Sequence, residues 1–243
     1  MTLRTNRLGL GVALLVAALP VLHARAASAQ DRPEPDPNSL GTHQKNIRLE
    51  AGTRVQLIGN EGLDAFSEND VVPQLALSAS WGFFAADALS LAAVGGFDYG
   101  GTSSRARNNA TSLDLSRFTL GPEARYHLFR TLALSAKVAP TLTREAAEVS
   151  TGIDSDLRSV AWKLGVDATA GAALELYGYR SGTSRKPRLW VTAEGGYGWT
   201  TAHDMILRPT EASEAPQRLM PLELEDLSVS GPLFRMTIAL SFR

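Results

Sequence analysis

The last segment of the chain before Arg243 has a large apolar residue at every second position. Successive side chains of a strand point to opposite faces, so these apolar residues share one face. They are Phe234, Met236, Ile238, Leu240 and Phe242. The opposite face carries Arg235, Thr237, Ala239 and Ser241. This alternation predicts a strand with one face in an apolar medium and the other in a polar one.

Seven earlier segments have the same period of two residues. Each is about the 9 to 11 residues that a tilted strand needs to cross a bilayer. They are residues 47–57, 72–83, 89–99, 117–128, 132–142, 160–174 and 189–199. We find no amphipathic helix of more than two turns. The pattern therefore predicts an all-β chain, an eight-stranded antiparallel up-and-down transmembrane β-barrel.

The connections between these segments alternate in length. Residues 84–87 and 129–130 are short links, and residues 175–188 form a longer one on the same side. The other connections are longer polar stretches, namely residues 58–71, 100–112, 143–159 and 200–230. Short periplasmic turns and long external loops are typical of outer-membrane barrels. The last loop is partly apolar, so we expect it to contact a partner or to fold over the barrel mouth; its apolar residues are Met205, Ile206, Leu207, Leu219, Met220 and Leu222.

The N-terminus has the three parts of a secretory signal. Arg4 and Arg7 precede an apolar run at 8–22, and Ala27-Ser28-Ala29 supplies the small residues that a signal peptidase requires. The run is about 15 residues, shorter than the roughly 20 of a spanning helix, which favours cleavage over an uncleaved anchor. We expect a signal peptide at 1–29, a flexible periplasmic leader at 30–45 and the barrel at 46–243.

Composition excludes several classes of protein. No later stretch has 18 consecutive apolar residues, so a helical inner-membrane protein is excluded. The 24 basic and 25 acidic residues give a net charge of −1, and nucleic-acid binding has no support. The chain has no cysteine, so no disulfide framework holds this exported protein together.

Aromatic residues on the apolar faces lie near the predicted strand ends. One end of the barrel would carry Phe97, Tyr99, Phe118, Trp162, Tyr197, Trp199 and Phe234. The periplasmic end would carry Trp81, Phe83, Tyr126 and Phe242. Two aromatic girdles around an aliphatic band match the preference of these rings for membrane interfaces. A soluble core would place aromatic residues at mid-strand at least as often.

The polar faces carry charges that would point into the barrel. An eight-stranded barrel is just wide enough for side chains to fill it, and buried charges must be paired. We therefore predict an ion-pair network in the lumen, made of Glu50, Arg54, Glu123, Arg125, Lys137, Asp167, Glu194 and Arg235. Arg48, Asp98 and Lys163 share these inner faces. A lumen filled in this way would conduct ions poorly.

These features resemble the eight-stranded outer-membrane β-barrel proteins of the OmpA/OmpX-like class over residues 46 to 242. The alternation ending at Phe242 is similar to the assembly signal of that class, which implies the barrel assembly machinery as a partner during biogenesis. Gly121-Pro-Glu-Ala-Arg-Tyr126 also resembles its strand-turn-strand segments. The resemblance implies the outer membrane of a Gram-negative bacterium, with outer-membrane lipid around the barrel.

Candidate catalytic residues are few. His43 falls in the leader, and His127 faces inward near a turn, where a lumen side chain is the simpler interpretation. His203-Asp204 lies in the last long loop, but two residues are too few for a metal site. We find no Gly-x-Ser-x-Gly, no phosphate-binding glycine loop and no His-x-x-x-His motif. We expect no catalytic site, no cofactor and no metal.

The sequence thus predicts a non-enzymatic outer-membrane protein that serves envelope integrity or surface interaction through its external loops, with an unknown partner. Three alternatives stay open: an outer-membrane lipid-modifying enzyme, a narrow pore, and a soluble periplasmic ligand-binding barrel.

Overall fold

The computed structural model describes residues 46–67, 69–86, 88–106, 109–129, 131–150, 156–177, 187–209 and 222–242. The predicted signal peptide at 1–29 and leader at 30–45 lie outside these residues, as do Leu219 and Met220 of the last long loop. No helix in the described ranges is long and apolar enough to cross a membrane.

The described chain consists of ten strands and one short 3₁₀ helix, η3 (Glu61–Leu63). The strands are β1 (Ile47–Leu57), β2 (Val71–Ala86), β3 (Leu89–Ala106), β4 (Asn109–His127), β5 (Leu132–Ser150), β6 (Leu157–Tyr177), β7 (Arg188–Thr200), β8 (His203–Pro209), β9 (Leu222–Leu227) and β10 (Gly231–Phe242).

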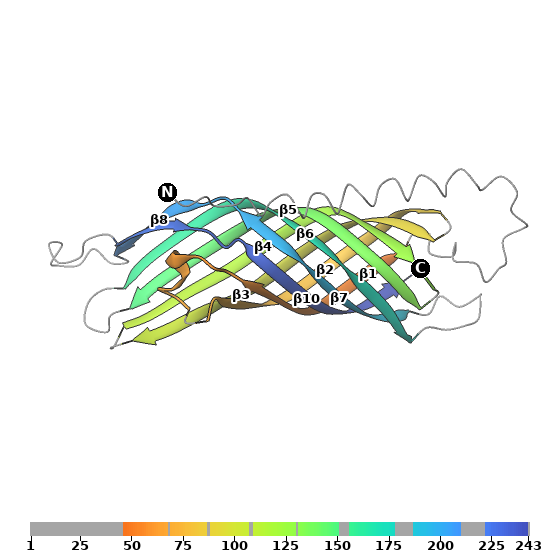
Figure 1. Cartoon of the computed structure of the whole chain (residues 1–243), viewed down its shortest axis with the longest axis horizontal. Coiled ribbons are helices and arrows are strands. Elements are labelled where there is room, and N and C mark those ends of the chain that lie inside the picture. Colours follow the sequence, from red (N-terminus) through yellow and green to blue (C-terminus); the bar gives the residue numbers. More distant parts are fainter. Residues whose placement is uncertain are drawn as a thin grey trace, which may run out of the picture. The chain divides into compact units, whose positions relative to one another are not determined.

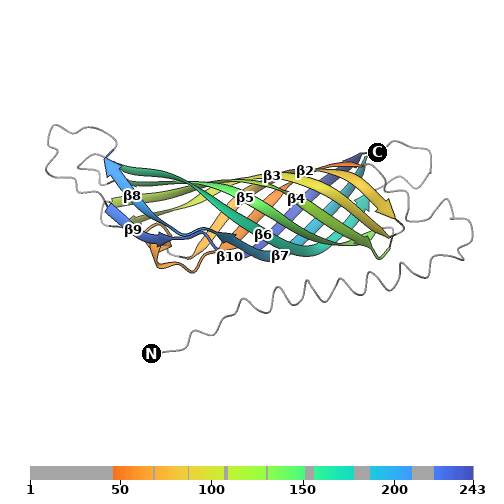
Figure 2. The same ribbon diagram turned by 90° about the horizontal axis from the view of Figure 1, so that it is seen from above.

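Eight of these strands form a closed antiparallel ring in the order β1 to β7 and then β10. The ring closes where β1 pairs with β10, from Ile47↔Phe242 to Gln56↔Leu233. The strands cross the barrel obliquely, and the C-terminus lies at the end opposite β8 (Figures 1 and 2). The predicted all-β, eight-stranded up-and-down barrel is therefore confirmed.

Several strands are longer than predicted, and two predicted loops are wrong. Most of residues 100–112 belongs to β3 and β4, which stay paired as far as Ala106↔Asn109. Most of residues 143–159 belongs to β5 and β6, which pair as far as Val149↔Leu157. The predicted loop at 200–230 contains a further hairpin, β8–β9, and β8 lies beside β6.

The strands were predicted too short because the apolar and polar faces exchange places along them. On β4, Phe118 points outward and is exposed, as a lipid-facing residue would be. Nearer the start of the strand the outward residues are Ser116 and Asp114, while Leu115 and Leu113 point inward and are fully buried. A search for apolar residues on one face of the strand therefore ends near Phe118, although the strand itself continues.

The exchange produces an apolar core at the end of the barrel that carries β8 and β9. We call it the mouth core. Its side chains come from the β1–β2 loop, from the first residues of β2, β4 and β6, from the last residues of β5, and from the β8–β9 region. It consists of Ile58, Leu63, Phe66, Val72, Leu113, Leu115, Ala147, Leu157, Met205, Leu207, Leu227 and Val229.

Hydrogen bonds attach the β1–β2 loop to the long β3–β4 hairpin. The Thr111 hydroxyl donates to the Ala65 carbonyl at 2.7 Å, and the Thr102 hydroxyl donates to the Phe66 carbonyl at 3.3 Å. Because Phe66 is fully buried in the mouth core, this loop closes the barrel end instead of extending from it.

Candidate functional site in the barrel interior

The inner face near the C-terminal end of the barrel holds a four-membered charge cluster, which we call the lower cluster. Arg48 donates to Glu123 at 2.6 Å and also pairs with Glu50 on its own strand. Arg125 pairs with Glu123 and lies 3.3 Å from Glu50. Two guanidinium groups and two carboxylates thus neutralise one another between β1 and β4. The alternation of each strand puts both charged residues of that strand on the inner face.

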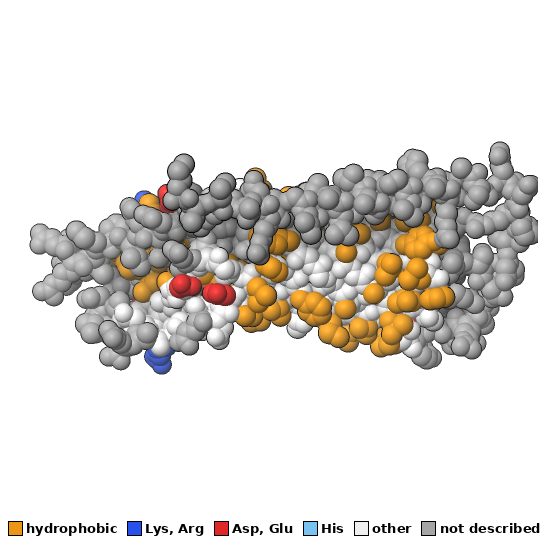
Figure 3. Space-filling model, in the orientation of Figure 1, with side chains coloured by type: hydrophobic (Ala, Val, Ile, Leu, Met, Phe, Trp, Pro, Cys, Tyr) orange, Lys and Arg blue, Asp and Glu red, His pale blue; other side chains and the backbone are white. Residues whose placement is uncertain are grey.

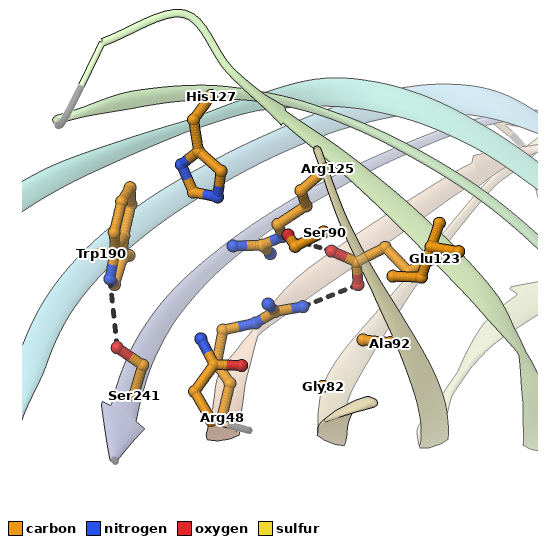
Figure 4. Close-up of a pocket in the computed structure, with 11 residues that line it drawn as sticks. Arg48, Gly82, Ser90, Ala92, Glu123, Arg125, His127, Trp190 and Ser241 are labelled. Carbon is orange, nitrogen blue, oxygen red and sulfur yellow. Dashed lines mark hydrogen bonds and ion pairs between the residues drawn. The ribbon is translucent and has the colours of Figure 1, made fainter. Parts of the chain in front are cut away.

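A cavity of about 20 Å³ lies beside the lower cluster. Figure 4 shows Arg48 and Arg125 converging on Glu123, with Trp190 across the cavity donating to Ser241. This volume is room for about one water molecule. It is far below the roughly 300 Å³ of ordinary ligand pockets, so the cavity is not a substrate site.

A second set of charges, the upper cluster, lies deeper in the barrel, below the mouth core. Arg54 bridges Asp98 at 3.1 Å and Asp167 at 3.3 Å. Arg117 adds a second contact to Asp167 at 2.8 Å, and Arg235 lies 3.6 Å from Asp98. Five residues from five strands therefore meet across the lumen, and all are buried.

The lumen has room for the upper cluster because the residue that faces it from β7 is a glycine. A Cβ atom at Gly198 would lie 2.8 Å from the Asp167 carboxylate and 3.1 Å from the Arg54 guanidinium. Gln56 links the cluster to the mouth core, accepting from Arg54 at 2.9 Å and donating to the Val229 carbonyl at 2.7 Å. The lumen is thus packed with side chains along this stretch.

Two further ion pairs of the described inner faces are buried. Lys137 lies 3.3 Å from Glu194, and Lys163 lies 2.8 Å from Glu145. Lys163 also donates to the Leu227 carbonyl of β9, which ties the hairpin to the barrel wall. All four side chains are buried.

The eight residues predicted for the lumen network all lie on the inner face, and each takes part in at least one ion pair. These residues are Glu50, Arg54, Glu123, Arg125, Lys137, Asp167, Glu194 and Arg235. Arg48, Asp98 and Lys163, which the alternation places on inner faces, also form ion pairs there. Arg117 and Glu145 belong to the ion pairs too but are not among the predicted residues. Both have the inward parity of their strands, which was the available signal, but Glu145 fell in a predicted loop.

The predicted girdle residues point outward. Two of them, Phe97 and Tyr126, are half-buried, and the others are exposed: Trp81, Phe83, Tyr99, Phe118, Trp162, Tyr197 and Trp199. On the side of the mouth core three rings lie side by side on β3, β4 and β6, with centroids 4.9 Å apart for Phe97 and Phe118 and 6.4 Å apart for Phe118 and Trp162. We call this row of rings the aromatic belt. Their predicted position at strand ends is wrong for β3, β4 and β6, since those strands continue well beyond the belt.

The five residues of the predicted assembly signal form one outward stripe on β10, and all are exposed. They are Phe234, Met236, Ile238, Leu240 and Phe242. Figure 3 shows apolar side chains spread over the part of the barrel nearer the C-terminus, with acidic and basic side chains at the opposite end. The outer surface is therefore apolar where the inner surface is ionic.

Of the three histidines considered as catalytic candidates, only His127 has a described side chain. The His127 ring stands edge-on to the Trp190 ring with centroids 6.3 Å apart, as expected for a packed lumen side chain (Figure 4). His43 lies outside the described residues, and the side chain of His203 is not among those described. Among the described residues, no group of three or more His, Cys, Asp or Glu is placed to hold a metal ion.

Two apolar residues of the predicted last long loop pack into the mouth core. Met205 and Leu207 of β8 are buried in the mouth core, whereas Ile206 between them faces outward. Of the residues predicted to act here, only these three have described side chains. Contact with a partner stays a prediction.

The strand ring, the apolar outer face and the ionic interior together define an eight-stranded barrel of the outer-membrane type. No family model matches the chain, and no curated protein matches it. Two solved structures of Ail, the attachment invasion locus protein of Yersinia pestis, are similar. One, in complex with the heparin analogue sucrose octasulfate, is 10% identical and covers 82% of this chain and 99% of that chain, with a TM-score of 0.45. The other is 9% identical and covers 82% of this chain and 97% of that chain, with a TM-score of 0.42. The assignment of the barrel type rests on the strand pairing and side-chain placement of this chain itself.

Proposed function

We propose that this chain is a non-enzymatic protein of the Gram-negative outer membrane that holds a rigid, closed platform outside the bilayer. The single observation that carries the proposal is the reversal of the barrel faces at the aromatic belt. Below the belt, apolar side chains point outward and charged ones inward. Above it, polar side chains point outward around the mouth core. Lipid around one part of the barrel and water around the other accounts for this arrangement.

The exposed apolar surface below the belt supports the membrane location. On β10 the outward residues are apolar without interruption from Phe234 to Phe242, and Ile238 at their centre is 58% exposed. Leu75 and Leu77 on β2 also point outward and are exposed. Soluble proteins rarely leave contiguous apolar patches beyond a few hundred Å² in water. A band that surrounds a barrel is therefore typical of a lipid contact.

The part beyond the belt supports a role in envelope structure or surface interaction. β4 continues nine residues past Phe118, to Asn109. At about 3.3 Å per residue and a tilt of about 45°, this corresponds to about 20 Å beyond the belt. Paired strands and an apolar core make this part rigid, so it would present a fixed surface of polar side chains to a partner.

The membrane assignment is tested by cell fractionation and by gel migration without boiling. We expect the protein in the outer-membrane fraction, and we expect the detergent-extracted protein to migrate differently before and after boiling, because a closed barrel resists unfolding in detergent. Recovery in the soluble periplasmic fraction, with identical migration in both samples, would favour the ligand-binding barrel instead.

The narrow-pore alternative makes an opposite prediction in planar bilayers. The upper cluster fills the lumen, and the mouth core above it contains residues with no exposed surface, such as Phe66 and Leu113. We therefore expect no stepwise current after reconstitution of the purified mature protein. A porin reconstituted in parallel is the positive control, and reproducible unitary currents from this protein would contradict the proposal.

A further inference from the structure

The ring of strands is closed by the two that lie farthest apart in the sequence. β1 and β10 pair from Ile47↔Phe242 to Gln56↔Leu233, and we call this pairing the seam. The other ring pairs join strands that follow one another directly or, for β7 and β10, enclose the β8–β9 hairpin. The entropy cost of bringing two segments together grows with the length of chain between them. The seam therefore has the largest such cost in the ring.

Two arginines oppose each other across the seam. Arg54 of β1 and Arg235 of β10 are register partners. Both side chains point into the lumen, where they are 1% and 4% exposed. Like charges directly opposite each other destabilise a strand pair, and burial removes the water that would screen them. At this level the seam is held together only if a negative charge lies between the two guanidinium groups.

The side chain that lies between them comes from β3. Asp98 accepts a hydrogen bond from Arg54 at 3.1 Å through one carboxylate oxygen, and its other oxygen lies 3.6 Å from the Arg235 guanidinium. Asp98 is itself 1% exposed. β3 pairs with β2 and β4 and with neither seam strand. One carboxylate from a third strand thus connects both sides of the seam.

Neighbouring carboxylates do not take over this role. Asp167 pairs with Arg54 at 3.3 Å but makes no ion pair with Arg235 among the described residues. Glu194 is the register partner of Arg235 on β7, yet its ion pair, at 3.3 Å, is with a lysine of β5. Within the described part of the chain, the ion pair of Arg235 is therefore the one with Asp98.

We propose that Asp98 is a latch for the seam. While its carboxylate lies between Arg54 and Arg235, β1 and β10 stay paired. When that charge is removed, the two arginines repel each other and the ring opens at the seam before it opens elsewhere. The latch couples closure of the ring to the position of β3, a strand that does not belong to the seam. It requires only the closed ring and not the proposed membrane location.

Hydrogen–deuterium exchange of the mature protein, folded in dodecyl maltoside micelles, tests the latch. Asp98→Asn keeps the shape of the side chain and removes its charge. The amides of β1 and β10 should then exchange about tenfold faster or more, relative to those of β5, which lies away from the seam. Adding Arg235→Gln to Asp98→Asn removes the like-charge pair and should return exchange at the seam to near the native rate.

Gel migration without boiling shows whether each variant closes. If Asp98→Asn alone does not give a closed barrel, the double variant with Arg235→Gln should still close. Failure of both variants to close would overturn the proposal, because relief of the repulsion would then not restore the seam.

Asp167→Asn is the matched control. It removes the same charge from the same cluster and also takes a carboxylate from Arg54, but it leaves Asp98 between the two arginines. It should destabilise the barrel without speeding exchange in β1 and β10 more than in β5. Equal acceleration of all three strands by Asp98→Asn, or the same selective acceleration of the seam by Asp167→Asn, would show a general loss of stability and no latch.

Discussion

Replacement of Ile238 by arginine should destabilise the folded barrel in lipid bilayers by about 2 to 4 kcal/mol. Ile238 is the central residue of the outward stripe on β10, with two apolar residues on either side of it along the same face. At this position an arginine lies near the middle of the hydrocarbon layer, where its charge loses hydration without gaining a partner. Reversible urea unfolding in lipid vesicles, followed by tryptophan fluorescence, measures the change.

The control for this variant is Ser103→Arg. Ser103 is exposed on β3 beyond the aromatic belt, so an arginine there remains in water and should change the free energy of unfolding by less than about 0.5 kcal/mol. If both variants had the same small effect, the outward face of β10 would not be in lipid, and the proposed membrane location would fail.

Asp167→Asn should destabilise the folded barrel by about 3 to 5 kcal/mol, because it removes one carboxylate of a buried ion-pair network and leaves the Arg117 guanidinium without its ion-pair partner. Asp167 is the carboxylate shared by Arg54 and Arg117, and Arg117 has no exposed surface. The substitution keeps the shape of the side chain, so the loss reports charge and not packing. The same unfolding experiment in vesicles measures it.

The double variant Asp167→Asn with Arg117→Gln separates charge imbalance from other effects. Because it removes one charge of each sign, it should recover a substantial part of the stability lost by Asp167→Asn. Glu148→Gln serves as the control, since Glu148 is exposed and makes no ion pair with a described residue; its effect should stay within about 0.5 kcal/mol. A double variant no more stable than Asp167→Asn alone would show that the pair with Arg117 does not explain the cost.

The candidate site shows which features can be predicted from the alternation of apolar and polar residues. Parity along each strand assigned Glu50, Arg54 and Asp167 to the lumen, and they lie there. Parity also assigns Arg117 inward, but its position at the start of a predicted strand hid its role in the upper cluster. Glu145 could not be assigned to the lumen, because the segment around it lacks an apolar outer face and was predicted to be a loop. The partner of each charge could not be predicted, since Asp167 meets arginines from strands far apart in the sequence.

The amino-acid sequence by itself determined the number of ring strands, the face that each residue of the eight predicted segments takes and the existence of an outward apolar band, because the two-residue period of a strand is a local property of the backbone. Only the tertiary structure decided the rest: the lengths of β3 to β6, the β8–β9 hairpin and the mouth core. The reason is that the preferred face depends on what surrounds the barrel. Below the aromatic belt apolar residues belong outside, and above it they belong inside. An alternation counted along one strand does not show where that boundary lies until neighbouring strands align their aromatic residues into a belt.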